Sequence, residues 1–214
     1  VPPGFWRGVN INQNAVFMEC FMDELAEYAG VDPVEFRRKY SANHPRNLAV
    51  LNAVADRIGW TKPAPAGVFR GIAQQKSFGS WVAAACELSV TDGNKIKIHR
   101  IVAATDPGYA VNPAQIERQV SGSFVYGLSA LFEEECTVKN GRIEQTNFDT
   151  FGSIRLKQMP PVETIIIQGG GKEWGGIGEP TISVAAPAVL NAFYRATGKR
   201  LRTIPLKNSG ITLV

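Results

Sequence analysis

Residues 81–104 read WVAAACELSVTDGNKIKIHRIVAA, two apolar and β-branched runs on either side of a short polar turn. The turn contains Asp92-Gly93, a pair that tolerates the positive φ values of a tight hairpin. We therefore expect Trp81–Val90 and Lys95 to about Ala104 to pair as antiparallel strands, with Phe69–Phe78 as a further strand before them. This stretch predicts a β-sheet in the middle of the chain.

The first sixty residues carry a helical pattern instead. Phe17, Phe21, Leu25 and Tyr28 recur every three or four residues, which makes the apolar stripe of an amphipathic helix, and Gly30 ends that helix. The next expected elements are a helix start at Asp32-Pro33-Val34-Glu35, with Asp32 as cap and Glu35 at the capping-box position, a helix at about Leu48–Ile58, and a connector at Gly59–Gly67.

Strands and helices are mixed after the first hairpin. The expected elements are a helix at Ala114–Ala130, a second hairpin of Cys136–Lys139 and Arg142–Gln145 around Asn140-Gly141, a short buried strand at Ile165–Ile167, and a last helix at Ala186–Ala196 ended by Gly198. The fold class is α+β. We expect one domain over residues 1–214, with a helical lead-in at 1–60 and an α+β body at 67–214.

Composition excludes several classes of protein. Of the 214 residues, 44% are hydrophobic and 20% are charged, which permits a buried core and excludes wholesale disorder. The longest apolar stretch, Ile182–Leu190, is interrupted by Ser183 and Pro187 and is far short of the roughly 20 residues of a membrane span. The net charge of +4 is mild, and the basic residues near the end fit a solvated helix end better than a nucleic-acid-binding stripe.

A metal site built from protein ligands is not expected. The three cysteines, Cys20, Cys86 and Cys136, are far apart, no CxxC occurs, and the only histidines are His44 and His99. We expect free buried thiols and no protein ligand to a metal.

The sequence GGGKEWGGIGEP at residues 169–180 is the first candidate site. It has neither the spacing of a phosphate-binding P-loop nor that of a GxGxxG dinucleotide loop. It places Glu179 between Gly178 and Pro180, where glycine lets the backbone approach a ligand closely and proline fixes the chain after the acid. The alternative is an ordinary solvated glutamate in a surface loop.

Two other segments are candidates on local chemistry. Trp6-Arg7-Gly8 offers a guanidinium to an oxygen-rich or anionic ligand, and the alternative is a surface arginine. Asp106-Pro107-Gly108 and Asn112-Pro113 lead into a helix bearing Gln119, whose amide can donate and accept hydrogen bonds. The alternative for Gln119 is a solvent-facing side chain.

Taken in order, these segments form a longer set of motifs. The motifs are Gly4-Phe5-Trp6-Arg7-Gly8-Val9, Phe17-Met18-Glu19-Cys20-Phe21-Met22-Asp23-Glu24-Leu25-Ala26, Asp32-Pro33 with Phe36-Arg37-Arg38, Gly71-Ile72-Ala73, Asp106-Pro107-Gly108 with Val111-Asn112-Pro113, Gln119 to Gly122, Gly127-Leu128, Asn147-Phe148, Gly176-Ile177-Gly178-Glu179-Pro180, Ala186-Pro187-Ala188 with Asn191-Ala192, and Ala196-Thr197-Gly198 with Arg200 and Arg202. In this order they resemble the molybdenum-cofactor subunit of the xanthine dehydrogenase/aldehyde oxidase family. The spacing is most similar to the isoquinoline 1-oxidoreductase β-subunit type. The resemblance implies the molybdopterin-binding domain and the C-terminal part of such a large subunit.

The resemblance also implies roles for single residues. Glu179 matches the active-site glutamate, which acts as general base, and Arg7 matches the arginine beside the substrate and the metal oxygens. These two are the expected catalytic residues. Trp6, Arg7, Gln119 and Gly178 are expected to contact the cofactor, and no protein residue is expected to ligate the metal.

The implied cofactor is molybdopterin, or molybdopterin cytosine dinucleotide, with molybdenum. The implied oxidoreductase hydroxylates an N-heteroaromatic compound or an aldehyde with water-derived oxygen and passes electrons to [2Fe–2S] clusters on a small partner subunit. The chain opens at Val1 without a signal peptide, so we expect a fragment that needs the N-terminal part of the large subunit and is inactive alone. We expect a bacterial protein of the cytoplasm or periplasm, with the periplasm favoured. The alternative function is a non-catalytic scaffold or assembly domain of the same fold.

Overall fold

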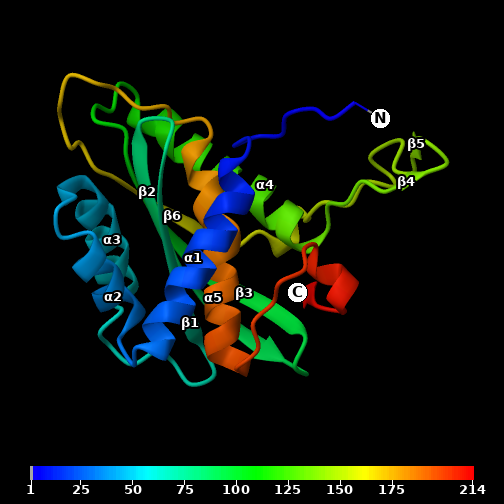
Figure 1. Cartoon of the computed structure of the whole chain (residues 1–214), viewed down its shortest axis with the longest axis horizontal. Coiled ribbons are helices and arrows are strands. Elements are labelled where there is room, and N and C mark those ends of the chain that lie inside the picture. Colours follow the sequence, from blue (N-terminus) through cyan, green and yellow to red (C-terminus); the bar gives the residue numbers. More distant parts are fainter. Residues whose placement is uncertain (1) are drawn as a thin grey trace.

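The computed structural model describes residues 2–214, and Figure 1 shows a sheet with helices on both faces. The expected α+β order is confirmed, because three helices come first and strands and helices are mixed after them. Within the described residues the helices are α1 (Ile11–Tyr28), α2 (Pro33–Tyr40), α3 (Pro45–Ile58), α4 (Pro113–Phe132) and α5 (Ala185–Thr197), with short 3₁₀ helices η1 (Leu156–Gln158), η2 (Pro180–Val184) and η3 (Leu206–Ser209). The strands are β1 (Phe69–Ser77), β2 (Ser80–Thr91), β3 (Lys95–Asp106), β4 (Val138–Lys139), β5 (Arg142–Ile143), β6 (Val162–Ile166) and β7 (Thr212–Leu213).

The main sheet has the order β1-β2-β3-β6, and β7 also pairs with β3. β1, β2 and β3 are antiparallel neighbours, and the Asp92-Gly93 turn has the positive φ values, 54° and 75°, that the sequence predicts. β6 runs parallel to β3, so the chain must cross over between them, and α4 makes much of that crossover.

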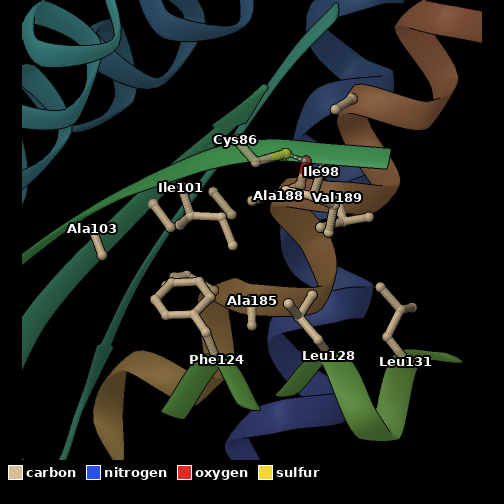
Figure 2. Packing of buried hydrophobic residues seen from close by; sticks show 14 of the residues in the cluster. Cys86, Ile98, Ile101, Ala103, Phe124, Leu128, Leu131, Ala185, Ala188 and Val189 are labelled. Carbon is tan, nitrogen blue, oxygen red and sulfur yellow. Dashed lines mark hydrogen bonds between the residues drawn. The ribbon is translucent and has the colours of Figure 1, made fainter. Parts of the chain in front are cut away.

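Hydrophobic side chains pack on both faces of this sheet. α3 covers one face, and α4 and α5 cover the other. Figure 2 shows the core on the face covered by α4 and α5. There Cys86 and Ile101 of the sheet lie near Phe124 and Leu128 of α4 and Ala188 of α5. This core holds α5 and α4, which carry or adjoin the residues expected in the site.

Small residues let α5 lie very close to β1. A Cβ atom on Gly71 would lie 2.2 Å from the Ala188 carbonyl oxygen and 2.2 Å from the Ala192 nitrogen. The Cys86 thiol donates to the same Ala188 oxygen at 3.3 Å, and burial raises the pKa of Cys86 to about 12, so it stays protonated. These contacts fix the start of α5 and therefore the position of Glu179, which directly precedes η2 and α5.

The apolar stripe of α1 faces away from the core. Phe17 is 68% exposed, Phe21 57% and Tyr28 94%, although the helix itself forms as predicted. The buried face of α1 includes two carboxylates, Glu19 and Asp23. Hydrophobic periodicity therefore predicts the helix correctly, but it does not predict which face of α1 packs against the sheet and α5.

Buried ion pairs replace apolar contacts on that face. Glu19 accepts a hydrogen bond from Arg37 at 2.9 Å and one from the Gln74 backbone N–H at 2.8 Å. Asp23 accepts from Arg200 at 2.8 Å. Since these partners lie on α2, on β1 and after α5, the two carboxylates of α1 join the helical lead-in to the body of the domain.

Most expected elements agree with the structure to within one or two residues at each end, but α3 is longer and the strands of the second hairpin are shorter than expected. α3 begins at Pro45 rather than about Leu48, because Pro45 takes the first helical position. The second hairpin has two residues in each strand instead of four, since all four residues, Val138–Lys139 and Arg142–Ile143, are exposed and gain no packing on a core. Asp32 caps α2 as predicted, through the N–H groups of Val34 and Glu35.

The structure also corrects the expectations for β6 and for the thiols. The sequence predicts a short buried strand at Ile165–Ile167, but the strand is Val162–Ile166 and its side chains are only half-buried. Cys86 is buried, whereas Cys20 is half-buried and Cys136 is exposed, so the prediction of buried thiols is wrong for Cys136. None of the helices in residues 2–214 combines the length and the apolar composition that crossing a bilayer requires.

Candidate active site

The Trp6-Arg7-Gly8 segment forms a tight turn just before α1. The Val9 N–H donates to the Trp6 carbonyl oxygen at 2.9 Å. Gly8 has a φ of 86°, and a Cβ atom there would lie 2.6 Å from a methyl carbon of Ile182. Glycine is therefore required at this position by both conformation and space, and its bare N–H can approach a neighbouring acid.

The Arg7 side chain joins this turn to α4 and to the glycine-rich segment. Its Nε donates to the Gly178 carbonyl oxygen at 2.9 Å. Its Nη2 donates to the side-chain oxygen of Gln119 at 3.0 Å and to Ser123 Oγ at 2.9 Å. The guanidinium carbon also lies 5.2 Å from the centre of the Tyr126 ring, within reach of a cation–π contact.

Glu179 lies opposite the same turn. Its Oε1 accepts a hydrogen bond from the Gly8 N–H at 3.0 Å, and Oε2 makes no hydrogen bond with the residues that the structure describes. The side chain is half-buried. Burial lowers the pKa of the Arg7 guanidinium from its ordinary value, and the neighbouring Tyr126 and Glu179 oppose that shift.

All five residues that the sequence predicts for the site therefore lie in one cluster. They are Trp6, Arg7, Gln119, Gly178 and Glu179.

Two further residues of the cluster, Ser123 and Tyr126, contact Arg7 from α4 and were not predicted from the sequence. They follow Gln119 by four and seven residues, a spacing that places all three on one face of a helix. That spacing is the signal that could have identified them. The Tyr126 ring also lies 6.0 Å from the Trp6 ring, centre to centre, so it lies against both Trp6 and Arg7.

The glycine-rich segment is held against protein backbone along much of its length. The Gly175 N–H donates to the Pro107 carbonyl oxygen at 2.9 Å, and the Gly176 N–H donates to the Phe78 carbonyl oxygen at 2.7 Å. The expectation that glycine here lets backbone approach a ligand does not apply to these two. At Gly178 a Cβ atom would meet nothing within 4 Å, so the expectation for this glycine stays a prediction.

Asp106 anchors the start of that segment. It is fully buried and accepts two hydrogen bonds from Arg46 at 2.7 Å, one from the Gly108 N–H at 2.9 Å and one from the Gly169 N–H at 3.1 Å. Arg46 in turn stacks on Trp81, 3.8 Å from the ring centre. Burial by itself raises the pKa of Asp106, but the hydrogen bonds from Arg46, Gly108 and Gly169 outweigh burial and hold the pKa below its ordinary value.

Asp106→Asn tests this anchor. Because the folded-state pKa is depressed, the ionised carboxylate adds stability above its unfolded pKa near 4, and that stability is lost as pH falls through the folded pKa. The variant is expected to lose about 2 kcal/mol at pH 7, typical of hydrogen bonds to a buried charge, and less than that at pH 3. Urea denaturation at the two pH values measures the difference.

The matched control is Asp92→Asn, at an exposed aspartate that pairs with Lys95 on the surface. Its expected cost is below about 0.5 kcal/mol at either pH. Hydrogen exchange gives a second readout, because the Gly169 amide should exchange faster in Asp106→Asn alone. Equal losses in the two variants would contradict the anchoring role.

Three polar groups of the cluster are not used within the described chain. They are Arg7 Nη1, Gln119 Nε2 and Glu179 Oε2, two donors and one acceptor. The Thr181 hydroxyl is also buried without a partner two residues beyond Glu179. Two donors without a partner in the described chain suit an oxygen-rich, anionic group, so these residues fit the cofactor that the resemblance implies.

Among residues 2–214, no group of three or more His, Cys, Asp and Glu side chains is placed to hold a metal ion.

Comparison with known proteins identifies the family. Residues 22–160 match the family model described as the molybdopterin cofactor-binding domain. The chain is 28% identical over 207 residues to the beta subunit of isoquinoline 1-oxidoreductase from Brevundimonas diminuta, covering 95% of this chain and 26% of that protein. It is 27% identical over 224 residues to a nicotinate dehydrogenase subunit of Pseudomonas putida, covering 96% of this chain and 19% of that protein.

Solved structures agree at the level of the fold. The aldehyde oxidoreductase of Desulfovibrio desulfuricans aligns with a TM-score of 0.74 at 13% identity, over 94% of this chain and 40% of that one. By the coverages given above, the chain spans only about a fifth to a quarter of the length of the two curated relatives. On the family match, the chain belongs to the molybdopterin cofactor-binding domains of the xanthine dehydrogenase/aldehyde oxidase family.

Proposed function

We propose that the chain forms part of the catalytic large subunit of a molybdenum hydroxylase that oxidises an N-heteroaromatic compound or an aldehyde with water-derived oxygen. The two curated relatives named above act, by their names, on isoquinoline and nicotinate, and a further relative, 25% identical over 215 residues, is named an aldehyde oxidoreductase molybdenum-binding subunit. The proposed cofactor is molybdopterin, or its cytosine dinucleotide, with molybdenum. Electrons leave to [2Fe–2S] clusters on a small partner subunit.

The observation that carries this proposal is the meeting of Arg7, Gln119 and Glu179. Arg7 lies 171 residues from Gly178 and 112 from Gln119 in sequence, yet it donates hydrogen bonds to both. Each of the three polar side chains makes hydrogen bonds within the cluster through some of its polar atoms. Each also has one polar atom that makes no hydrogen bond with the described residues. These atoms are the groups with which the cluster can bind a cofactor or a substrate.

We assign a separate role to the cofactor and to each residue of the cluster. The cofactor, when bound, supplies the two-electron oxidation. Arg7 Nη1 and Gln119 Nε2 are the donors that would hold and orient its oxygen atoms. Glu179 is the general base: the Gly8 N–H holds Oε1, so Oε2 is the atom that takes up a proton. Trp6, packed on Tyr126, limits access from one side.

Metal analysis tests the proposal. Molybdenum is measured by inductively coupled plasma mass spectrometry on the full-length subunit purified with its small subunit, and on the 214-residue chain alone. We expect about one molybdenum per complex, because one such site is proposed per large subunit, and none in the lone chain, because these residues form only part of the pocket.

A folded complex without molybdenum would overturn the proposal and favour the scaffold function, in which the fold persists without the reaction. A folded complex with molybdenum then goes to a substrate screen. N-heterocycles and aldehydes are the two classes to compare, and turnover of neither would contradict the proposed substrate range.

A further inference from the structure

An apolar groove of about 760 Å³ lies alongside α1, and we refer to it as the α1 groove. Its walls come from the N-terminal segment, α1, α4, η2, the start of α5 and the chain after α5. Most of its lining is hydrophobic, and the lining residues on which the following argument rests are Phe5, Trp6, Val16, Phe17, Phe21 and Leu131.

Large apolar side chains stand exposed at the groove. Phe5 is 95% exposed, Phe17 68% and Phe21 57%, so three phenyl rings lie in water next to one hollow. Contiguous apolar surface of this kind is uncommon on a free-standing domain and marks a site of interaction.

The helix cannot turn these rings inward. The opposite face of α1 is held by the buried Glu19–Arg37 pair and by the Asp23–Arg200 pair. Rotating α1 to bury Phe17 and Phe21 would expose or unpair both carboxylates, which is costly for buried charges. The exposed stripe is therefore a fixed property of the fold.

The groove also favours an apolar occupant over a charged one. Arg202, which lines one side, already forms a two-bond pair with Glu24 at 2.9 and 3.0 Å. With its cation paired, this side of the groove holds no unmatched charge to attract an acidic partner. Most of the other lining residues are apolar, and the uncharged amides Asn10, Asn12 and Gln13 are the polar ones.

We propose that the α1 groove is the surface on which this chain packs against the rest of its own large subunit, through an apolar segment of that polypeptide. The match to the Brevundimonas diminuta protein covers 95% of this chain but 26% of the relative, so about three-quarters of such a polypeptide lies outside the matched region. The groove is bordered by Trp6, the neighbour of Arg7, so the packed segment adjoins the candidate site. This inference rests on the proposed function, because that function assigns the chain to a longer subunit.

Side-chain footprinting with hydroxyl radicals tests the proposal directly. The labelling rates of Phe5, Phe17 and Phe21 are compared in the 214-residue chain and in the full-length subunit. We expect these rates to fall about tenfold in the full-length subunit, as expected for rings moved into the desolvated centre of an interface. Tyr28 is the internal control, since it is 94% exposed on the same helix but does not line the groove.

Equal labelling of the three rings in both proteins would overturn the proposal. Protection that is already present in the lone chain, and is lost on dilution as its sedimentation coefficient falls, would assign the groove to a second copy and overturn it too. The molybdenum content of the same full-length sample is measured separately. Protection without molybdenum would leave the groove assignment standing while the proposed function fails.

A pair of double variants gives an independent test by thermal unfolding. Phe17→Ser/Phe21→Ser removes two rings that line the groove, and Met18→Ser/Tyr28→Ser removes two exposed side chains of the same helix that do not. In the lone chain the two double variants are expected to change Tm alike. In the full-length subunit the groove variant alone is expected to lower Tm further, and an equal change there would contradict the proposal.

Discussion

Replacing Glu179, the proposed general base, with glutamine in the full-length subunit is expected to lower kcat of the proposed reaction by about 10²–10⁴-fold, the usual contribution of a general base. Glutamine keeps an oxygen for the Gly8 N–H, which lies 3.0 Å from Oε1 of the native acid, so the turn before α1 should persist. The variant loses only the proton acceptor at Oε2. Steady-state kcat, measured at equal molybdenum content, gives the result.

The matched control is Glu173→Gln, an exposed acid in the same glycine-rich segment. It makes the same change in charge and volume but has no contact with the Arg7 cluster, so activity should stay at the wild-type level. Molybdenum content should be unchanged in both variants. A Glu179→Gln enzyme with full molybdenum and undiminished kcat would show that another group takes the proton.

Arg37→Met is expected to cost about 3–5 kcal/mol of the free energy of unfolding, the range for breaking a buried ion pair by removing one partner. Arg37 is fully buried, and its Nε and Nη2 donate at 2.9 Å to the carboxylate and to the carbonyl oxygen of Glu19. Removing the cation leaves the Glu19 carboxylate buried beside an apolar side chain. Urea denaturation of the 214-residue chain measures the loss.

The neighbouring residue supplies the control. Arg38 pairs with the exposed Glu35 and donates a hydrogen bond to Asn52 at 2.8 Å, so Arg38→Met is expected to cost only about 1 kcal/mol. Adding Glu19→Gln to Arg37→Met should recover part of the loss, because it removes the unpaired charge. If Arg37→Met costs no more than Arg38→Met, the buried pair does not join the lead-in to the domain in the way described.

The elements that the sequence predicts well are those whose determinants lie close together in the chain. Asp92-Gly93 turns the hairpin and Asp32 caps α2, because each needs only a few neighbouring residues to form its hydrogen bonds. The segment before Pro180 likewise stands out by its own composition. Its resemblance to a family motif then indicates Glu179.

The orientation of α1 could not be predicted in this way. Periodicity shows that Phe17 and Phe21 share a face, but only the contacts with α2, β1 and α5 decide that the face with Glu19 and Asp23 is buried. A carboxylate on a helix is normally taken as solvent-facing. Its burial here depends on arginines that the fold brings from distant parts of the chain.

The sequence by itself determined the secondary-structure order, the hairpin, and the family motifs that contain Arg7, Gln119 and Glu179. Only the tertiary structure decided that these residues meet, that Ser123 and Tyr126 join them, and that Asp106 anchors the glycine-rich segment. The physical reason is the range of the interactions. Turns and caps are satisfied within about four residues, whereas the bond from Arg7 to Gly178 spans 171 residues and exists only once the sheet, α4 and α5 have packed.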